Sequence, residues 1–306
     1  MKRSWESLLT LSVVHFMLFP ETMAGEGPVV ESIEKLALDD FLGGVEITLI
    51  KDAQARAAVR SIAAQSGLKL GFGAQPVLLS SGTSLNNLDD DGRKRAIKLI
   101  QGCVDQAAEM GCARLAFLTG PDPGDAQRDR ALDLLADSVK TLCAYAADKD
   151  LALTLETFDR DIDKKSILGP SALSAAFAQR IREDYPTFGL MYDLSHMPLL
   201  HETAHEALPI LQPYLVHMHV GNAVMIPGKP AFGDLHPRFG YPHSENDTPE
   251  LIEFLQTLFE IGYLQDAPPE TKPWVGIEVR PQGDESSEMI WAQTKRTWRA
   301  AWSALQ

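Results

Sequence analysis

The chain is poor in cysteine and in basic residues. Its three cysteines, Cys103, Cys112 and Cys143, form no Cys-x-x-Cys pair and leave an odd number, so neither a disulfide framework nor a zinc finger follows. A reducing compartment is the simpler interpretation, and we expect a cytoplasmic protein. The 28 lysines and arginines stand against 42 aspartates and glutamates, which gives a formal net charge of −14. Because this excess repels a phosphate backbone, nucleic acid and acidic membranes are disfavoured as partners.

No internal repeat, low-complexity tract or interdomain linker interrupts the 306 residues, of which 45% are hydrophobic. This composition is typical of a globular protein and excludes disorder as the dominant state. The length also suits an α/β barrel folded as one domain. The apolar stretch near the start of the chain is too short to span a bilayer, so no membrane segment is expected.

The first 25 residues have two interpretations. Basic residues at positions 2 and 3, an apolar stretch from Leu8 to Phe19 and small residues near Ala24 match the pattern of a secretory signal peptide. The competing interpretation is a buried strand over 11–19, rich in β-branched and aromatic residues and ended by Pro20. Cleavage near Ala24 would remove the first of the eight strands described next, which favours the strand.

Eight short apolar segments alternate with longer amphipathic segments. The expected strands are residues 11–19, 45–48, 68–73, 113–118, 151–156, 188–193, 215–220 and 275–279. The expected helices are residues 29–38, 53–64, 93–110, 126–147, 171–182, 205–211, 250–261 and 289–305. This alternation predicts βα units and a parallel sheet. Eight units predict a (β/α)8 TIM barrel as a single domain over 1–306, with a doubly wound open sheet as the lesser alternative.

Polar side chains lie at or near the ends of four consecutive expected strands. They are Glu156, Asp193, the pair His217 and His219, and Glu278. The C-terminal ends of barrel strands converge at one mouth, where such enzymes carry out their chemistry. Carboxylates brought together there repel one another unless a cation or a shared proton compensates. Three carboxylates and one imidazole form a hard ligand set, so we predict a divalent metal: Mn²⁺ foremost, then Mg²⁺ or Co²⁺, with Zn²⁺ as a further candidate.

At these positions the chain resembles the xylose-isomerase-like barrels. That family includes sugar isomerases and epimerases, inosose dehydratases, hydroxypyruvate isomerases and AP endonucleases of the endonuclease IV type. The resemblance is carried by four motifs: Leu-Glu156, Asp193-Leu-Ser-His196, His217-Met-His219-Val-Gly and Ile-Glu278-Val. It implies one catalytic metal held by Glu156, Asp193, His219 and Glu278.

The ketose 3-epimerase branch of this family implies further roles. The glutamates that match Glu156 and Glu278 exchange the substrate proton, one from each face, and the histidine that matches His196 contacts substrate oxygens. The chemistry is coherent, because a metal on the carbonyl and hydroxyl oxygens acidifies the adjacent C–H and stabilises the enediolate. A carboxylate within reach then moves the proton.

The similarity to the AP endonucleases is incomplete. No histidine occurs between His15 and His196, so the histidines that those nucleases take from early strands are missing. Yet Asp234-Leu-His236 looks like the motif with which they bind another zinc, together with the equivalent of His196. One interpretation is a second metal on His196, Asp234 and His236. The other is a substrate-covering loop that hydrogen-bonds hydroxyls through Asp234, His236 and Arg238.

That loop, 221–247, far exceeds the usual ~2–6 residues, and long loops tend to be functional, so we expect an active-site loop. Glu46 ends an early expected strand. It either contacts the substrate or supports a residue that does, or it belongs to a buried ion pair. Arg280 lies two residues after Glu278 and so points to the same side, where it binds substrate or offsets negative charge. Gln75 and His15 either line the pocket or are buried in the core with their hydrogen bonds made there.

The primary hypothesis is a metal-dependent sugar or keto-sugar isomerase or epimerase that transfers a proton next to a carbonyl through a metal-stabilised enediolate. The alternative is a keto-sugar dehydratase or keto-glycoside lyase with the same metal site. Missing histidines and the charge of −14 count against an AP-endonuclease-type phosphodiesterase, and the full ligand set counts against a non-catalytic barrel. No Gly-rich phosphate loop is evident, so the expected partner is an unphosphorylated carbohydrate. Barrels of this kind often associate, so a homo-oligomer is compatible.

Overall fold

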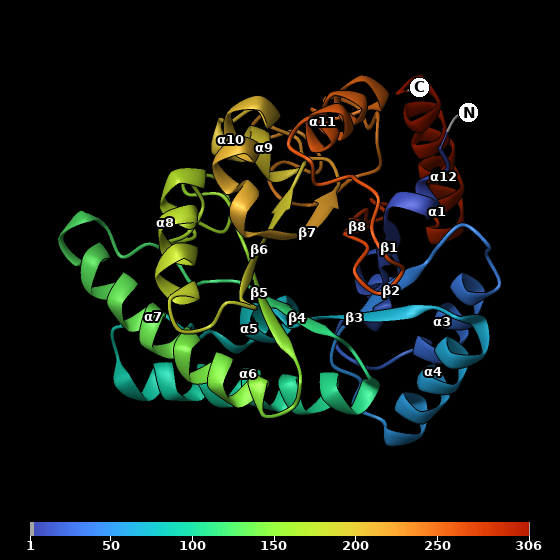
Figure 1. Ribbon diagram of the computed structural model, residues 1–306. Helices are drawn as coiled ribbons and strands as arrows, with labels where there is room; N and C mark the ends of the chain where they lie inside the picture. The colour runs from blue at the N-terminus through green and yellow to red at the C-terminus, as the bar shows by residue number, and fades with distance from the viewer. Residues whose placement is uncertain (1–2, 306) are drawn as a thin grey trace.

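The protein, described by a computed structural model over residues 3–305, is a closed barrel of eight parallel strands (Figure 1). The strands are β1 (Thr10–Val14), β2 (Gly44–Ile47), β3 (Lys69–Gly73), β4 (Arg114–Phe117), β5 (Ala152–Glu156), β6 (Gly189–Asp193), β7 (Leu215–Val220) and β8 (Trp274–Ile277). Each strand pairs with the next in sequence, and β8 pairs with β1, Trp274 opposite Thr10. The predicted (β/α)8 barrel is therefore confirmed.

Helices surround the barrel on the outside (Figure 1). They are α1 (Trp5–Leu8), α2 (His15–Leu18), α3 (Val29–Ala37), α4 (Ala53–Ser66), α5 (Gln75–Ser81), α6 (Asp90–Met110), α7 (Asp125–Ala147), α8 (Ser171–Arg182), α9 (His196–Leu200), α10 (Ala204–Leu211), α11 (Thr248–Glu260) and α12 (Ser287–Ala304), with 3-10 turns η1 (Pro20–Thr22) and η2 (Gln212–Tyr214). Caps explain their bounds: before α6, the Asp89 carboxylate accepts the Gly92 N–H, and Gly111 with φ +74° ends the helix. Within residues 3–305, no helix is both long and apolar enough to cross a membrane.

The strands are buried on both faces, which is why they appear in the sequence as nearly continuous apolar runs. All five residues of β1 and all five of β6 are buried. The main hydrophobic core fills the space between the strands and the helices. A second cluster, Val14, Phe16 and Met17 with Met23 packed against it, lies apart from that core, and we name it the α2 cluster.

The predicted first strand, 11–19, is wrong at its end. β1 stops at Val14, and His15–Leu18 form the helical turn α2. The neighbouring strands set this limit, because β2 pairs with β1 only as far as Val14 opposite Glu46. A short apolar run does not distinguish a buried strand from a buried helical turn by periodicity. The segment is nevertheless a barrel strand, paired with β2 on one side and β8 on the other.

The long segment 221–247 is ordered by its own hydrogen bonds. Val224 forms isolated bridges with Phe232 and with Ser244. The Asn222 side chain accepts the N–H of Asn246 at 2.7 Å, and the Asn246 amide donates to the Gly221 carbonyl at 3.0 Å. These contacts fix a loop whose residues Asp234 and His236 are buried.

Candidate metal centre

The structure brings the four predicted ligands together. They are Glu156 at the end of β5, Asp193 at the end of β6, His219 in β7 and Glu278 directly after β8. One nitrogen or oxygen of each lies within 4.8 Å of those of the other three, and all four residues are buried. The convergence follows from the barrel, which gathers the carboxyl ends of parallel strands at one mouth. That the four hold a metal stays a prediction.

His219 is oriented by hydrogen bonding on its far side. Its Nε2 lies 2.9 Å from Glu46 Oε2. A carboxylate accepts, so Nε2 carries a proton. Burial lowers the pKa of His219, but the charges of Glu46 and Glu278 raise it well above its usual value, so a metal would displace the second proton, on Nδ1. Nδ1 lies 2.7 Å from Glu278 Oε2, 3.6 Å from Glu156 Oε1 and 4.0 Å from Asp193 Oδ2. The ring thus offers a ligand atom to the space between the three carboxylates.

The donor set fits a divalent cation. Glu156 Oε1 and Asp193 Oδ2 are buried without a hydrogen-bond partner, a costly state for polar atoms. His219 Nδ1 is buried among carboxylate oxygens. Burial raises the pKa of Asp193, and the nearby charge of Glu278 raises it further, although the charges of neighbouring imidazoles oppose both. A cation among these atoms would satisfy both oxygens and offset the repulsion between carboxylates.

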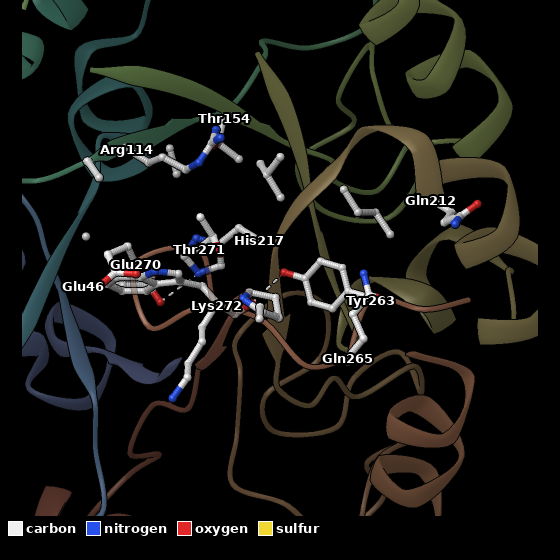
Figure 2. A pocket seen from close by; sticks show the side chains of 18 of the residues that line it. Glu46, Arg114, Thr154, Gln212, His217, Tyr263, Gln265, Glu270, Thr271 and Lys272 are labelled. Carbon is white, nitrogen blue, oxygen red and sulfur yellow. Dashed lines mark hydrogen bonds and ion pairs between the residues drawn. The ribbon is translucent and has the colours of Figure 1, made fainter. Parts of the chain in front are cut away.

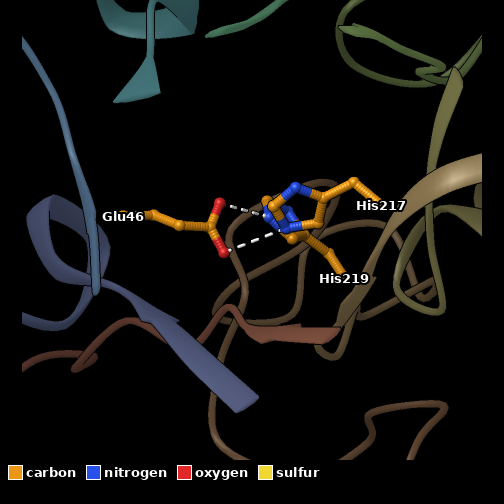
Figure 3. A group of neighbouring side chains, drawn as sticks. All are labelled: Glu46, His217 and His219. Carbon is orange, nitrogen blue, oxygen red and sulfur yellow. Dashed lines mark hydrogen bonds and ion pairs between the residues drawn. The ribbon is translucent and has the colours of Figure 1, made fainter. Parts of the chain in front are cut away.

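Glu46 crosses the barrel interior from β2 to β7, where it meets two imidazoles (Figure 3). Its Oε1 accepts from His217 Nε2 at 3.1 Å and from the Ser12 hydroxyl at 2.6 Å. Burial alone would raise the pKa of Glu46, but His217 and His219 hold it well below the usual range. Gly276 makes room for this arrangement, since a Cβ there would lie 2.2 Å from Glu46 Oε1. These contacts are those of a group that orients His219; a contact with substrate, the other predicted role of Glu46, stays a prediction.

The residues predicted to surround the centre divide into two groups. Gln75 lines the cavity and donates from Nε2 to Glu156 Oε2 at 2.7 Å, which leaves Oε1 of that glutamate directed at the centre. Arg280 also lines the cavity, and within residues 3–305 its guanidinium has no ion-pair partner. His15 does not belong to the cavity lining, because its ring is buried against Ser32 Oγ at 2.7 Å. Arg238 is likewise turned away and pairs with Glu285 at 2.9 Å.

A second cluster lies beside the first. His196 Nε2 is 3.1 Å and His236 Nε2 is 2.8 Å from Asp234 Oδ1. His196 Nδ1 donates to the Thr157 carbonyl at 2.7 Å. Despite burial, which lowers it, the charge of Asp234 raises the pKa of His196 to about 10 and, with Glu278, that of His236 to about 9. Asp193, His196 and His236 also form a group with the spacing of metal ligands.

Lys164, a residue that the sequence interpretation missed, already places a cation at this cluster. Its ammonium lies 3.1 Å from Asp234 Oδ2 and 3.0 Å from Asp163 Oδ2. The loop after β5 delivers it there, because the Asp159 carboxylate accepts the backbone N–H groups of Ile162, Asp163 and Lys164 at 2.7–2.8 Å. No motif in the sequence signals this turn.

Cavities open at both ends of the barrel. The one above the candidate ligands has a volume of about 640 Å³ and is lined by Glu156, His219, Glu278 and Arg280 among others. The other, of about 600 Å³, lies where strands begin, and Figure 2 shows Arg114, His217 and Tyr263 around it. Because barrel enzymes carry out chemistry at the C-terminal ends of their strands, the first cavity is the candidate active site.

The chain belongs to the xylose isomerase-like TIM barrel family, whose model matches residues 40–296. The predicted family is thus confirmed. No curated protein sequence matches the chain.

Several solved structures share the fold. L-Ribulose 3-epimerase superposes with a TM-score of 0.73 at 13% identity, over 97% of this chain and 96% of that one. 3-Keto-D-glucoside 4-epimerase from E. coli superposes with a TM-score of 0.64 at 16% identity, over 95% of this chain and 99% of that one. An AP endonuclease, family 2, from Brucella melitensis gives 0.68 at 17% identity, over 94% and 99%. At such identities these likenesses establish the fold alone.

Proposed function

We propose that the protein is a metal-dependent isomerase or epimerase of sugars or keto-sugars, with Mn²⁺ as its metal and a small carbohydrate as its substrate. The observation that carries the proposal is the pair of buried, unpartnered carboxylate oxygens on Glu156 and Asp193, which face His219 Nδ1. Glu156 and His219 also line an open cavity. The fold relatives named as a ribulose 3-epimerase and a keto-glucoside 4-epimerase support the same chemistry.

The proposed reaction is proton transfer next to a carbonyl. A bound divalent cation would polarise the substrate carbonyl as a Lewis acid and so acidify the neighbouring C–H. Glu156 and Glu278 both line the cavity, on either side of Asp193 and His219 in strand order, and we assign the removal and return of the proton to their carboxylates. Gln75 fixes the orientation of the Glu156 carboxylate by donating to Oε2 at 2.7 Å.

We propose that the second cluster binds and orients substrate. His196, His236 and Arg280 would contact substrate oxygens, and the loop 221–247 would cover the site through Asp234 and His236. The ion pair between Lys164 and Asp234 supports this role over a second metal, and it counts against a phosphodiesterase that needs several metals. A keto-glycoside lyase remains the second candidate, because the cavity is larger than a hexose requires.

Metal content tests the first step. The protein is loaded with excess Mn²⁺, Co²⁺ or Zn²⁺, desalted and measured by elemental analysis. We expect one metal ion per chain in the wild type and none in Glu156→Gln or Asp193→Asn, whereas Glu288→Gln, on the exposed start of α12, keeps it. A wild-type protein that binds no metal contradicts the proposal.

Proton transfer is tested by solvent deuterium exchange into ketoses and 3-keto-glucosides. The metal-loaded wild type is expected to label the carbon next to the carbonyl. Glu278→Gln is expected to abolish labelling while circular dichroism stays native. Labelling that persists in Glu278→Gln refutes the assigned role of that carboxylate.

A further inference from the structure

One wall of the active-site cavity is apolar. It consists of Phe16, Met17, Met23, Val77, Leu79 and Leu235, contributed by α2, the segment after η1, α5 and the long loop. Phe16, Met17 and Met23 belong to the α2 cluster, which lies apart from the main core. Leu79 is 50% exposed and Leu235 36% exposed. Of the six, only Val77 packs against the main core, so packing of the barrel core does not account for the other five.

The apolar wall continues directly into the polar floor. Glu156, Glu278 and Gln75 line the same cavity as Leu79 and Met17. Its volume of about 640 Å³ falls within the ~300–1,000 Å³ of pockets that enclose drug-sized ligands. A free hexose is much smaller and carries hydroxyl groups on almost every carbon. Those hydroxyls would lose hydrogen bonds to water against such a wall without replacement.

We propose that the apolar wall binds the aromatic aglycone of a keto-glycoside whose sugar ring lies over the metal ligands. The proposal rests on the proposed function, because it takes the sugar ring to be the part on which Glu156 and Glu278 act. An aromatic ring suits this wall, since the thioethers of Met17 and Met23 are flexible and make favourable contacts with aromatic rings. The cavity thus recognises both parts of the ligand: the oxygens of the sugar at the floor and the apolar surface of the aglycone at the wall.

The probes are the methyl and phenyl glycosides of 3-keto-D-glucose, which differ only in the aglycone. Their affinities for the metal-loaded protein are measured by calorimetry. We expect the phenyl glycoside to bind at least about tenfold more tightly, because its ring leaves water for the wall. Leu79→Gln should reduce this preference several-fold. Leu38→Gln is the matched control: Leu38 is 83% exposed at the end of α3, outside the cavity, and its replacement should leave the preference unchanged.

A second pair of variants tests whether the effect of Leu79→Gln comes only from a local change in α5. Met23→Gln should also weaken the phenyl preference, whereas Met289→Gln, 71% exposed on α12, should not. Equal affinities of the two glycosides, or no binding of either, overturns the proposal. Deuterium exchange in the same samples separates the two hypotheses. Exchange without a phenyl preference refutes only the apolar subsite, and phenyl binding without exchange into any keto-sugar refutes only the proposed function.

Discussion

Nε2 of His219 lies 2.9 Å from Oε2 of Glu46, on the side of the imidazole that faces away from the three carboxylates. The two residues belong to β7 and β2, which are not neighbours, so this hydrogen bond crosses the barrel interior. It holds a proton on Nε2, so that a metal which displaces the proton from Nδ1 would bind the ring through Nδ1.

Glu46→Gln should therefore weaken metal binding without removing a proposed ligand. Loss of a partner that orients a ligating histidine typically lowers metal affinity by about 10–100-fold. The measurement is competitive titration with a chelating dye, with circular dichroism to establish that the fold survives. Glu288→Gln serves as the control. An unchanged affinity in Glu46→Gln would mean that this carboxylate only fills the barrel interior.

Lys164→Met should admit a second Zn²⁺. The ammonium of Lys164 now neutralises Asp234, and its removal leaves that carboxylate with His196 and His236 as neighbours. Elemental analysis after zinc loading should show more metal than in the wild type. Lys165→Met is the matched control, because Lys165 is exposed and adjacent in sequence. A stoichiometry that stays at the wild-type value would show that Lys164 is not what excludes the ion.

His15 should make folding sensitive to acid. Burial lowers the pKa of His15 from 6.5 to about 3. Between these values the unfolded chain takes up a proton that the folded chain does not, so stability falls as the pH falls from about 6.5 towards 3, at up to about 1.4 kcal/mol per pH unit. The comparison is urea unfolding of the wild type and His15→Gln between pH 7 and pH 4.5. Identical pH slopes in the two proteins would contradict the prediction.

The three thiols should be inert in the folded protein. Burial raises the pKa of Cys103, Cys112 and Cys143 to about 12, and the thiolate is the reactive form. A thiol-specific chromogenic reagent at pH 8 should label none of them quickly in native protein and all three in denaturant. Rapid native labelling would mean that the helices around them open.

Much of the fold could be predicted because the strands carry an unambiguous pattern. The expected strands 188–193 and 215–220 are apolar and bounded by turns; the observed β6 begins one residue later, at Gly189, and β7 has the predicted bounds. The end of β1 could not be predicted, since it depends on where β2 and β8 stop pairing. The helix α5 was also missed, because a segment of seven residues that contains Pro76 is too short to show a helical period.

The site was predictable where topology alone brings residues together. Strand ends meet at the barrel mouth, so Glu156 and Glu278 could be placed side by side without coordinates. The contact of Glu46 with His219 could not be predicted, because a contact between β2 and β7 depends on side-chain length and on the space left by Gly276. Lys164 was equally hidden, since its position depends on a turn wound around Asp159.

The proposed ligands come from β5 to β8 and the carboxylate that supports them from β2, so the candidate centre exists only when the ring of strands is closed. An ion bound there would contact residues from several strands at once. Because it would bind only the closed barrel, its binding free energy would add to the free energy of unfolding. By mass action, metal at about 100 times its dissociation constant would add about 2.7 kcal/mol to the free energy of unfolding. The melting temperature should then rise with free metal in the wild type and stay flat in Asp193→Asn. Under the proposed function, a cell starved of the metal would hold a chain that is not only inactive but easier to unfold.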